Sequence, residues 1–266
     1  MNSVVVIVPV YKTCLSADEK VSFLQTLRML GNHPICIVCP ETLNFAINEI
    51  EVCEDFISVF VERFPNVFFE GISGYNRLLL SEEFYARFAE YDYMLICQLD
   101  AYVFRDELLE WCSKGYDYIG APLFGRDFDI ENGKVGNGGL CLRRVKAYLD
   151  FFKGKKNVFK IDDIANRISL QSKPFTRWLV WILMAFGWRN KPKTVARRWQ
   201  YNEDVFWSLV LNGTNYELNK PEPLEALHFS FERFPSEAFL LLEELPFGCH
   251  AWRKYQYEEF WKEHIQ

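Results

Sequence analysis

The chain has 266 residues, of which 50% are hydrophobic and 17% aromatic. These apolar side chains are enough for one substantial core, so we expect one compact domain and no second independent one. The net charge of −6 argues against a nucleic-acid-binding protein, because affinity for phosphate backbones comes from clustered Lys and Arg.

The first 40 residues read as a strand, a helix and a second strand. Val4–Val10 is dominated by β-branched residues, which is typical of a parallel strand buried on both faces. A helix is predicted over residues 16–30, with Ser16 as N-cap and Glu19 at capping-box spacing, and Pro34–Cys39 gives the next strand. A βαβ unit of this kind builds a parallel sheet.

The loop after the first strand contains Tyr11, which is expected to reach the ligand crevice at the carboxyl end of the sheet. Cys36 and Cys39 have the spacing of a redox or zinc pair, but no second pair matches it, so structural thiols are expected. No signal-peptide pattern precedes Val4, which favours a reducing, cytoplasmic location.

Ile57–Val61 and Val67–Glu70 are predicted as strands or strand edges. From Tyr75 to Ala89 the apolar residues recur at helical spacing, which predicts a helix preceded by a loop over Gly71–Gly74.

Asn76 and Arg77 open this predicted helix. An amide and a guanidinium at a helix start suit a nucleotide base, ribose or phosphate. Pairing of Arg77 with Glu82 or Glu83 explains the same residue equally well.

The run Tyr91–Phe104, YDYMLICQLDAYVF, leads from a buried strand into a single carboxylate. Asp100 is therefore predicted at the carboxyl end of that strand, where open α/β sheets bind ligands. Gln98 precedes it in the same turn. The alternative is that Asp100 is only a turn former or helix cap.

Four further motifs follow, which read YDYIGAP, GNGGLCLR, EDVFW and FGCHAW. Together with QLDAYVF they resemble the metal-dependent glycosyltransferases of GT-A type, and more closely a bacterial glycosyltransferase family of that type, over residues 70–255. The resemblance implies a single-domain, Rossmann-like α/β fold with a mostly parallel central sheet flanked by helices. Residues 1–125 would form the nucleotide-donor half, and residues 126–266 the acceptor half.

The resemblance also implies roles for site residues. In the D-x-D signature of such enzymes two carboxylates hold a divalent metal, whereas this chain reads Gln98-Leu99-Asp100. Asp100 and His250 are the expected ligands of Mn²⁺ or Mg²⁺, since carboxylate oxygen and imidazole suit such ions. The alternative for His250 is a structural histidine.

The Glu-Asp motif is the expected source of a general base. By the resemblance, Asp204 would be the base of an inverting transfer and Glu203 would position the acceptor; a plain acidic helix start is the alternative. Gly138 and Gly139 let the backbone approach a sugar closely, or form an ordinary turn.

Residues 164–202 contain eight cations and no acidic residue, and they include the apolar run Trp178–Trp188. Eleven apolar residues are too few to cross a bilayer, which needs about 20. The pattern matches a segment lying in the headgroups of an anionic membrane, with Trp181, Ile182 and Phe186 facing lipid. A buried helix whose flanking cations are solvated is an equal alternative.

The sequence thus predicts a cytoplasmic glycosyltransferase, peripheral at the inner face of the cell membrane. Its partners would be a nucleotide-sugar donor, a glycan or lipid-linked saccharide acceptor for envelope or capsule material, and an anionic membrane surface. The alternatives are a nucleotidyltransferase acting on a sugar phosphate, and a catalytically silent sugar- or membrane-binding module.

Overall fold

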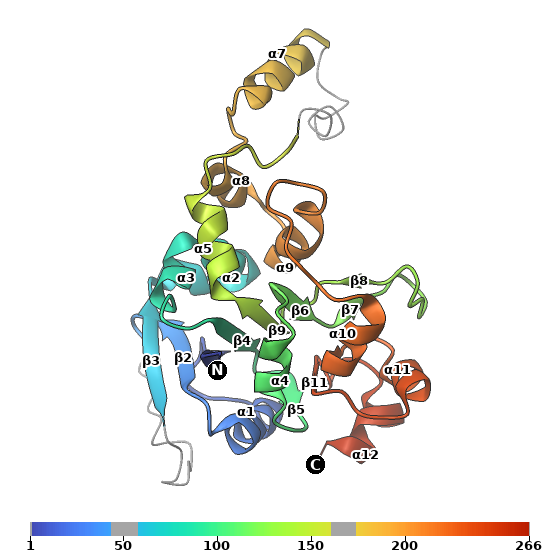
Figure 1. The fold of residues 1–266 in the computed structure, drawn as a ribbon. Helices are drawn as coiled ribbons and strands as arrows, with labels where there is room; N and C mark the ends of the chain where they lie inside the picture. Colours follow the sequence, from blue (N-terminus) through green and yellow to red (C-terminus); the bar gives the residue numbers. More distant parts are fainter. Residues whose placement is uncertain (1, 44–57, 161–173, 266) are drawn as a thin grey trace.

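A six-stranded sheet forms the centre of the computed structural model, which describes residues 2–43, 58–160 and 174–265 (Figure 1). The strand order is β3-β2-β1-β4-β9-β6. All neighbours from β3 to β4 are parallel, and β9 runs antiparallel between β4 and β6. The strands are β1 (Val4–Pro9), β2 (Ile35–Pro40), β3 (Val59–Phe64), β4 (Tyr93–Cys97), β6 (Tyr118–Gly120) and β9 (Leu140–Arg144).

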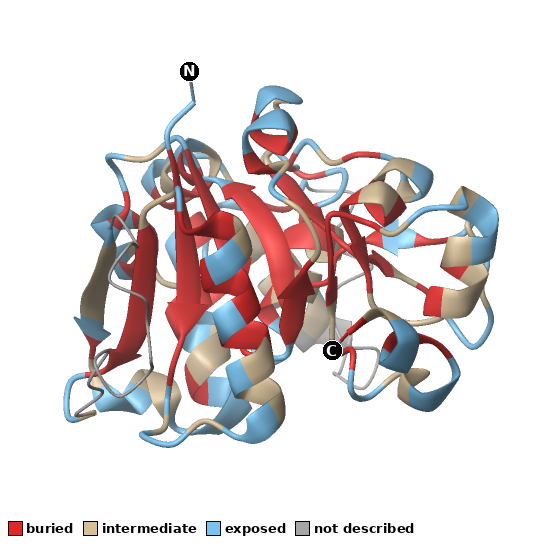
Figure 2. Ribbon diagram, turned by 90° about the horizontal axis from the view of Figure 1, so that it is seen from below, coloured by how far each residue is buried: buried red, intermediate tan, exposed pale blue. Residues whose placement is uncertain are grey.

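The fold is therefore α/β with a mostly parallel central sheet flanked by helices, as the sequence predicts. Every residue of β1, β2 and β4 is buried, which explains their continuous apolar composition (Figure 2). α1 lies on one side of the sheet; α2, α3 and α5 lie on the other (Figure 1). These helices are α1 (Ala17–Leu30), α2 (Gly71–Leu79), α3 (Glu82–Arg87) and α5 (Val145–Lys153).

The predicted first helix is confirmed in detail. The Ser16 side chain accepts a hydrogen bond from the Glu19 N–H, and the Glu19 carboxylate accepts one from the Ser16 N–H. This capping box fixes where α1 begins. Cys36 and Cys39 are buried free thiols in β2.

Two predictions between residues 57 and 89 are wrong. Val67–Glu70 is not a strand, because Asn66–Phe69 forms a 3₁₀ helix, and Ile57 lies outside the described residues. The helix expected over Tyr75–Ala89 is two helices, of which α2 already begins at Gly71. Ser81 interrupts them because its hydroxyl caps α3 by accepting from the Phe84 N–H.

A smaller sheet joins distant parts of the chain. It has the order β10-β11-β5, with β11 antiparallel to β5 and parallel to β10. Its strands are β5 (Ala101–Val103), β10 (Ser230–Phe231) and β11 (Gly248–His250). A two-stranded ribbon, β7 (Pro122–Leu123) with β8 (Lys134–Val135), continues from β6. The remaining helices nearby are α4 (Leu108–Ser113), α10 (Pro223–Phe229), α11 (Pro235–Leu242) and α12 (Lys262–His264), the last preceded by a π turn over Tyr257–Trp261.

The basic aromatic segment contains α7 (Pro174–Ala185) and α8 (Pro192–Arg198). In the part of the chain that the structure describes, no helix is both long and apolar enough to cross a membrane. α9 (Glu203–Val205) follows α8 and continues into a π-helical turn over Phe206–Val210.

Candidate active site

Asp100 lies in the tight turn between β4 and β5. The Ala101 N–H closes this turn by donating to the Gln98 carbonyl at 2.9 Å, and the Gln98 N–H donates to the Gly139 carbonyl at 2.8 Å. The Asp100 side chain is 53% exposed. β1 lies between β2 and β4, so this turn stands at the carboxyl edge of the sheet where the strand order reverses.

His250 is brought onto Asp100 by the pairing of β11 with β5, in which His250 stands opposite Ala101. Its Nε2 atom lies 3.2 Å from Asp100 Oδ1, and its Nδ1 atom lies 3.2 Å from Glu232 Oε1. The imidazole and the Glu232 side chain are only 12% and 11% exposed. Nε2 is buried and makes no well-aligned hydrogen bond to any described residue.

The two carboxylates control the charge of His250. Burial alone would lower its pKa, but the close contacts with the Asp100 and Glu232 carboxylates and their negative charges raise it from 6.5 to about 9. Burial opposes ionisation of Asp100 as well, yet the contact with His250 lowers the pKa of that carboxyl. The cluster is therefore an imidazolium held between two carboxylates at neutral pH.

Gly139 and Gly138 make the approach of the neighbouring side chains possible. A Cβ on Gly139 would lie 2.1 Å from the His250 ring, and a Cβ on Gly138 would lie 2.9 Å from Glu203 Oε1 and 3.0 Å from Asp204 Cβ. Any larger residue would push these side chains away. The glycine pair thus separates the Asp100–His250 contact from the Glu-Asp motif.

Glu203 forms a buried ion pair. Its Oε1 accepts from Arg143 Nη2 at 2.7 Å, and Arg143 Nη1 donates to the Tyr85 hydroxyl at 2.8 Å. Arg143 is fully buried and Glu203 is 4% exposed. Burial raises the pKa of Glu203, and the Arg143 charge opposes that rise. Asn76 Oδ1 accepts from the Glu203 N–H at 3.1 Å, which fixes the start of α9.

Asp204, the next residue of the same helix start, is half-buried. Burial raises the pKa of Asp204, and the negative charge of Glu232 adds to this rise. Hydrogen bonds from the Val205 and Gly138 N–H groups and the charge of Arg143 lower it, but by less. A carboxylate with a raised pKa is a stronger base.

The structure brings together most of the residues that the sequence singles out: Gln98, Asp100, Gly138, Gly139, Glu203, Asp204 and His250. Asn76 touches the cluster through Glu203. Tyr11 follows β1 and is 57% exposed. Arg77 donates to Ser73 Oγ and the Val67 carbonyl, so the alternative of a pairing with Glu82 or Glu83 is not found.

Three site residues have no role predicted from the sequence. Glu232 orients His250, Arg143 anchors Glu203, and the exposed Lys254 helps to lower the pKa of Asp100. The signal for Glu232 was its place directly after the alternating apolar residues Leu227, Phe229 and Phe231, a pattern typical of a strand.

The cluster fits a divalent metal with two protein ligands. Across the described ranges, no three His, Cys, Asp or Glu side chains converge as a metal site. Asp100 Oδ1 and the unbonded His250 Nε2 nevertheless lie side by side, and Glu232 holds the opposite ring nitrogen. Metal-ligating histidines are usually held in this way by a carboxylate on the second nitrogen.

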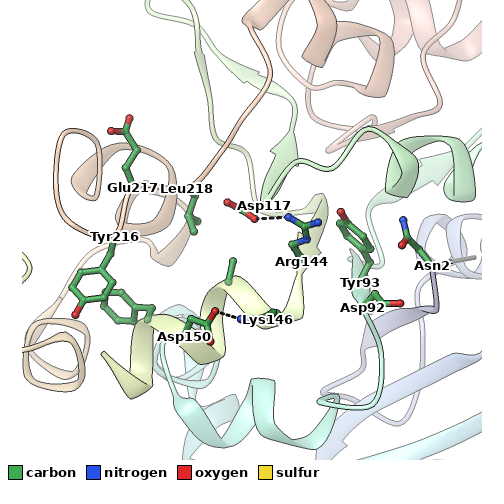
Figure 3. Close-up of a pocket in the computed structure, with 12 residues that line it drawn as sticks. Asn2, Asp92, Tyr93, Asp117, Arg144, Lys146, Asp150, Tyr216, Glu217 and Leu218 are labelled. Atoms are coloured by element: carbon green, nitrogen blue, oxygen red, sulfur yellow. Dashed lines mark hydrogen bonds and ion pairs between the residues drawn. The ribbon is translucent and has the colours of Figure 1, made fainter. Parts of the chain in front are cut away.

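A cavity of about 580 Å³ lies at the opposite edge of the sheet (Figure 3). It is lined by Asp92, which precedes β4, and by Arg144, which ends β9. Arg144 also pairs with Asp117 at 3.5 Å in its wall. Charges of both signs line this cavity, and none of the clustered site residues contributes to it.

The sequence model of one protein family matches residues 58–250. The chain belongs to this family, described as Protein of unknown function (DUF5672). The match extends from the start of β3 to His250, so it contains Asp100, both glycines, the Glu-Asp motif and Glu232. A search of curated proteins finds no match.

Several solved structures are similar to the chain. One is a glycosyltransferase involved in the glycosylation of the major capsid of PBCV-1, with 9% identity, TM-score 0.46, and coverage of 99% of this chain and 98% of the other. The galactosyltransferase LgtC, in complex with donor and acceptor sugar analogs, has 12% identity, TM-score 0.49, and coverage of 92% and 86%. The glycosyltransferase GlyE of Streptococcus pneumoniae TIGR4 has 13% identity, TM-score 0.43, and coverage of 94% and 54%.

Proposed function

We propose that this protein is a glycosyltransferase of GT-A type that moves a sugar from a nucleotide-sugar donor to an envelope or capsule glycan precursor. The observation that carries the proposal is the convergence of Asp100, His250 and Asp204 around the pair Gly138–Gly139. This convergence stands at the switch point of an α/β sheet, where such folds bind nucleotides.

The donor would bind across the carboxyl edge of the sheet. Tyr11, exposed after β1, is available for the nucleotide, and Gln98 lies in the same turn as Asp100. Lys254 is exposed with its charge near Asp100, which suits a diphosphate. Arg77 is exposed on α2, where it donates to Ser73 Oγ and the Val67 carbonyl, and together with Asn76 it stays a predicted nucleotide contact.

Asp100 and His250 would hold Mn²⁺ or Mg²⁺, with Glu232 keeping the imidazole in position. When bound, the ion would supply positive charge to the departing diphosphate. His250 must give up its Nε2 proton to serve as a ligand, so the ion and the proton compete for the same atom.

Asp204 is the proposed general base of an inverting transfer. Its carboxylate would take the proton of the acceptor hydroxyl while that oxygen bonds to the anomeric carbon. The bond from that carbon to the diphosphate breaks in the same displacement, and the leaving group takes the electron pair. Glu203 would act through Arg143 by holding α9 in place, since both side chains are buried.

The rival enzyme class is disfavoured by the loop after β1. A nucleotidyltransferase needs a basic loop there for a triphosphate, yet Lys12 is its one cation and is paired with Glu19 at 2.6 Å. A silent sugar-binding module would bind the donor without turnover, and the experiment below separates it from an enzyme.

The test is a thermal-shift panel of nucleoside diphosphates with and without Mn²⁺, followed by assay of nucleotide-sugar hydrolysis. We expect one diphosphate to raise the melting temperature only with Mn²⁺, and Asp100→Asn to abolish that shift while keeping the fold. Asp150→Asn, an exposed aspartate on α5, is the matched control and should behave as wild type. A panel without any Mn²⁺-dependent shift would refute the proposal. Binding without hydrolysis would leave the silent module.

A further inference from the structure

α7 is apolar on two opposite faces. On one face Trp181, Met184 and Ala185 pack against the buried core. At 100° per residue, positions 178, 179, 182, 183 and 186 fall together on the other face, within a sector of about 140°. Three of these side chains, Leu179, Leu183 and Phe186, are 42%, 37% and 88% exposed.

Two side chains anchor the C-terminal end of α7. The Asn157 side chain donates to the Ala185 carbonyl at 2.9 Å, and the Asn190 side chain donates to the Met184 carbonyl at 3.1 Å. Asn190 itself is fully buried and also bonds both backbone groups of Phe159. Figure 1 shows α7 at one extremity of the molecule, beyond α5 and α8.

Exposed cations follow this apolar face in the chain. Although the whole chain carries a net charge of −6, residues 164–202 contain no acidic residue. The exposed cations that follow α7 are Arg189, Lys191, Lys193, Arg197 and Arg198. Lys193 pairs with Glu82 of α3. An exposed apolar face followed by cations without acidic neighbours in sequence is complementary to an anionic surface with an apolar interior.

We propose that α7 and α8 bind the surface of a membrane that contains anionic lipids, with α7 lying in the headgroup region. The 12 residues of α7 extend about 18 Å, which is too short for a hydrocarbon core of about 30 Å, so the helix lies in the plane of the surface. Trp178 and Trp188, 57% and 40% exposed, are of the type that membrane interfaces favour. A second copy of this chain is disfavoured as the occupant, because it would bring the same cations face to face.

The position of α9 adds a consequence for the acceptor. α8 ends at Arg198 and α9 begins at Glu203, so only a short connection joins the proposed membrane-binding helix to the helix start that carries Asp204. The acceptor would then be a lipid-linked saccharide presented at that surface. This assignment rests on the proposed function, whereas membrane binding itself does not.

The test is co-sedimentation of the full chain with vesicles of phosphatidylcholine alone or mixed with phosphatidylglycerol. We expect binding to the mixed vesicles only, weakened but not abolished by high salt. Arg197→Gln with Arg198→Gln should lower the partition coefficient about 30-fold, which corresponds to about 1 kcal/mol per cation. Leu183→Ser with Phe186→Ser should remove the salt-resistant part of the binding.

The matched control is Ile72→Ser with Leu240→Ser, at positions 77% and 81% exposed outside this segment, and it should bind as wild type. Equal, negligible binding to both vesicle types would overturn the proposal, as would binding that the Arg197 and Arg198 variant leaves unchanged. Light scattering that shows a wild-type dimer and a Phe186→Ser monomer would also overturn it. The Mn²⁺-dependent diphosphate shift should persist in all these variants, so failure here is distinguishable from failure of the proposed function.

Discussion

The imidazolium of His250 makes the stability of the metal-free protein depend on pH. Its folded pKa of about 9 lies above the unfolded value near 6.5, so the protonated form contributes stability that is fully present below pH 6.5. That contribution is lost as the pH rises through 9. Linkage gives about 3 kcal/mol in total, of which about 2 kcal/mol disappears between pH 6.5 and 8.5. Asp100 is half exposed, so screening by water makes these figures upper bounds.

Urea unfolding of EDTA-treated protein at half-unit steps of pH measures this loss. The free energy of unfolding should fall by up to about 2 kcal/mol from pH 6.5 to 8.5 in wild type, compared with His250→Gln. The measurement stops at pH 8.5 because thiols begin to ionise in the unfolded chain above that pH. Burial raises the pKa of Cys97 to about 12, so this thiol stays protonated in the folded protein, and the fold loses stability for that separate reason. Equal pH slopes in wild type and His250→Gln would refute an imidazolium shared by Asp100 and Glu232.

Three further changes test the rest of the cluster. Gly139→Ala places a Cβ 2.1 Å from the His250 ring, so it should displace the imidazole and weaken Mn²⁺-dependent diphosphate binding at least tenfold, as measured by calorimetry; unchanged binding would mean that His250 is not a ligand. Asp204→Asn should lower turnover at saturating donor by about 10²–10⁴-fold while donor binding survives, and full turnover in this variant would remove the general base. Arg143→Met leaves Glu203 buried without its partner and should cost about 3–5 kcal/mol of unfolding free energy, whereas a loss below about 1 kcal/mol would show that water reaches the site.

Local sequence patterns determined the elements and several of the chemical groups. β-branched runs predicted β1 and β2, the capping box predicted where α1 begins, and the apolar run before Asp100 predicted a carboxylate at a strand end. These signals depend on side-chain period and on neighbours within four residues, so they are readable without the fold. The same local logic missed the Ser81 cap that divides α2 from α3.

Only the tertiary structure decided which of these groups meet. His250 reaches Asp100 because β11 pairs with β5, whose residues lie about 150 positions earlier, and β10 then brings Glu232 to the second ring nitrogen. No local period encodes strand order or register between such distant segments, since they follow from packing of the whole core. α7 shows the same limit. Its residues from Trp178 onward are all apolar, and the sequence expected Trp181, Ile182 and Phe186 to face lipid. The structure leaves Phe186 exposed but packs Trp181 against the core. In an amphipathic helix, the 3.6-residue period of apolar side chains shows which face is buried. Where apolar residues cover the whole circumference, only the packing of the helix in the folded protein shows this.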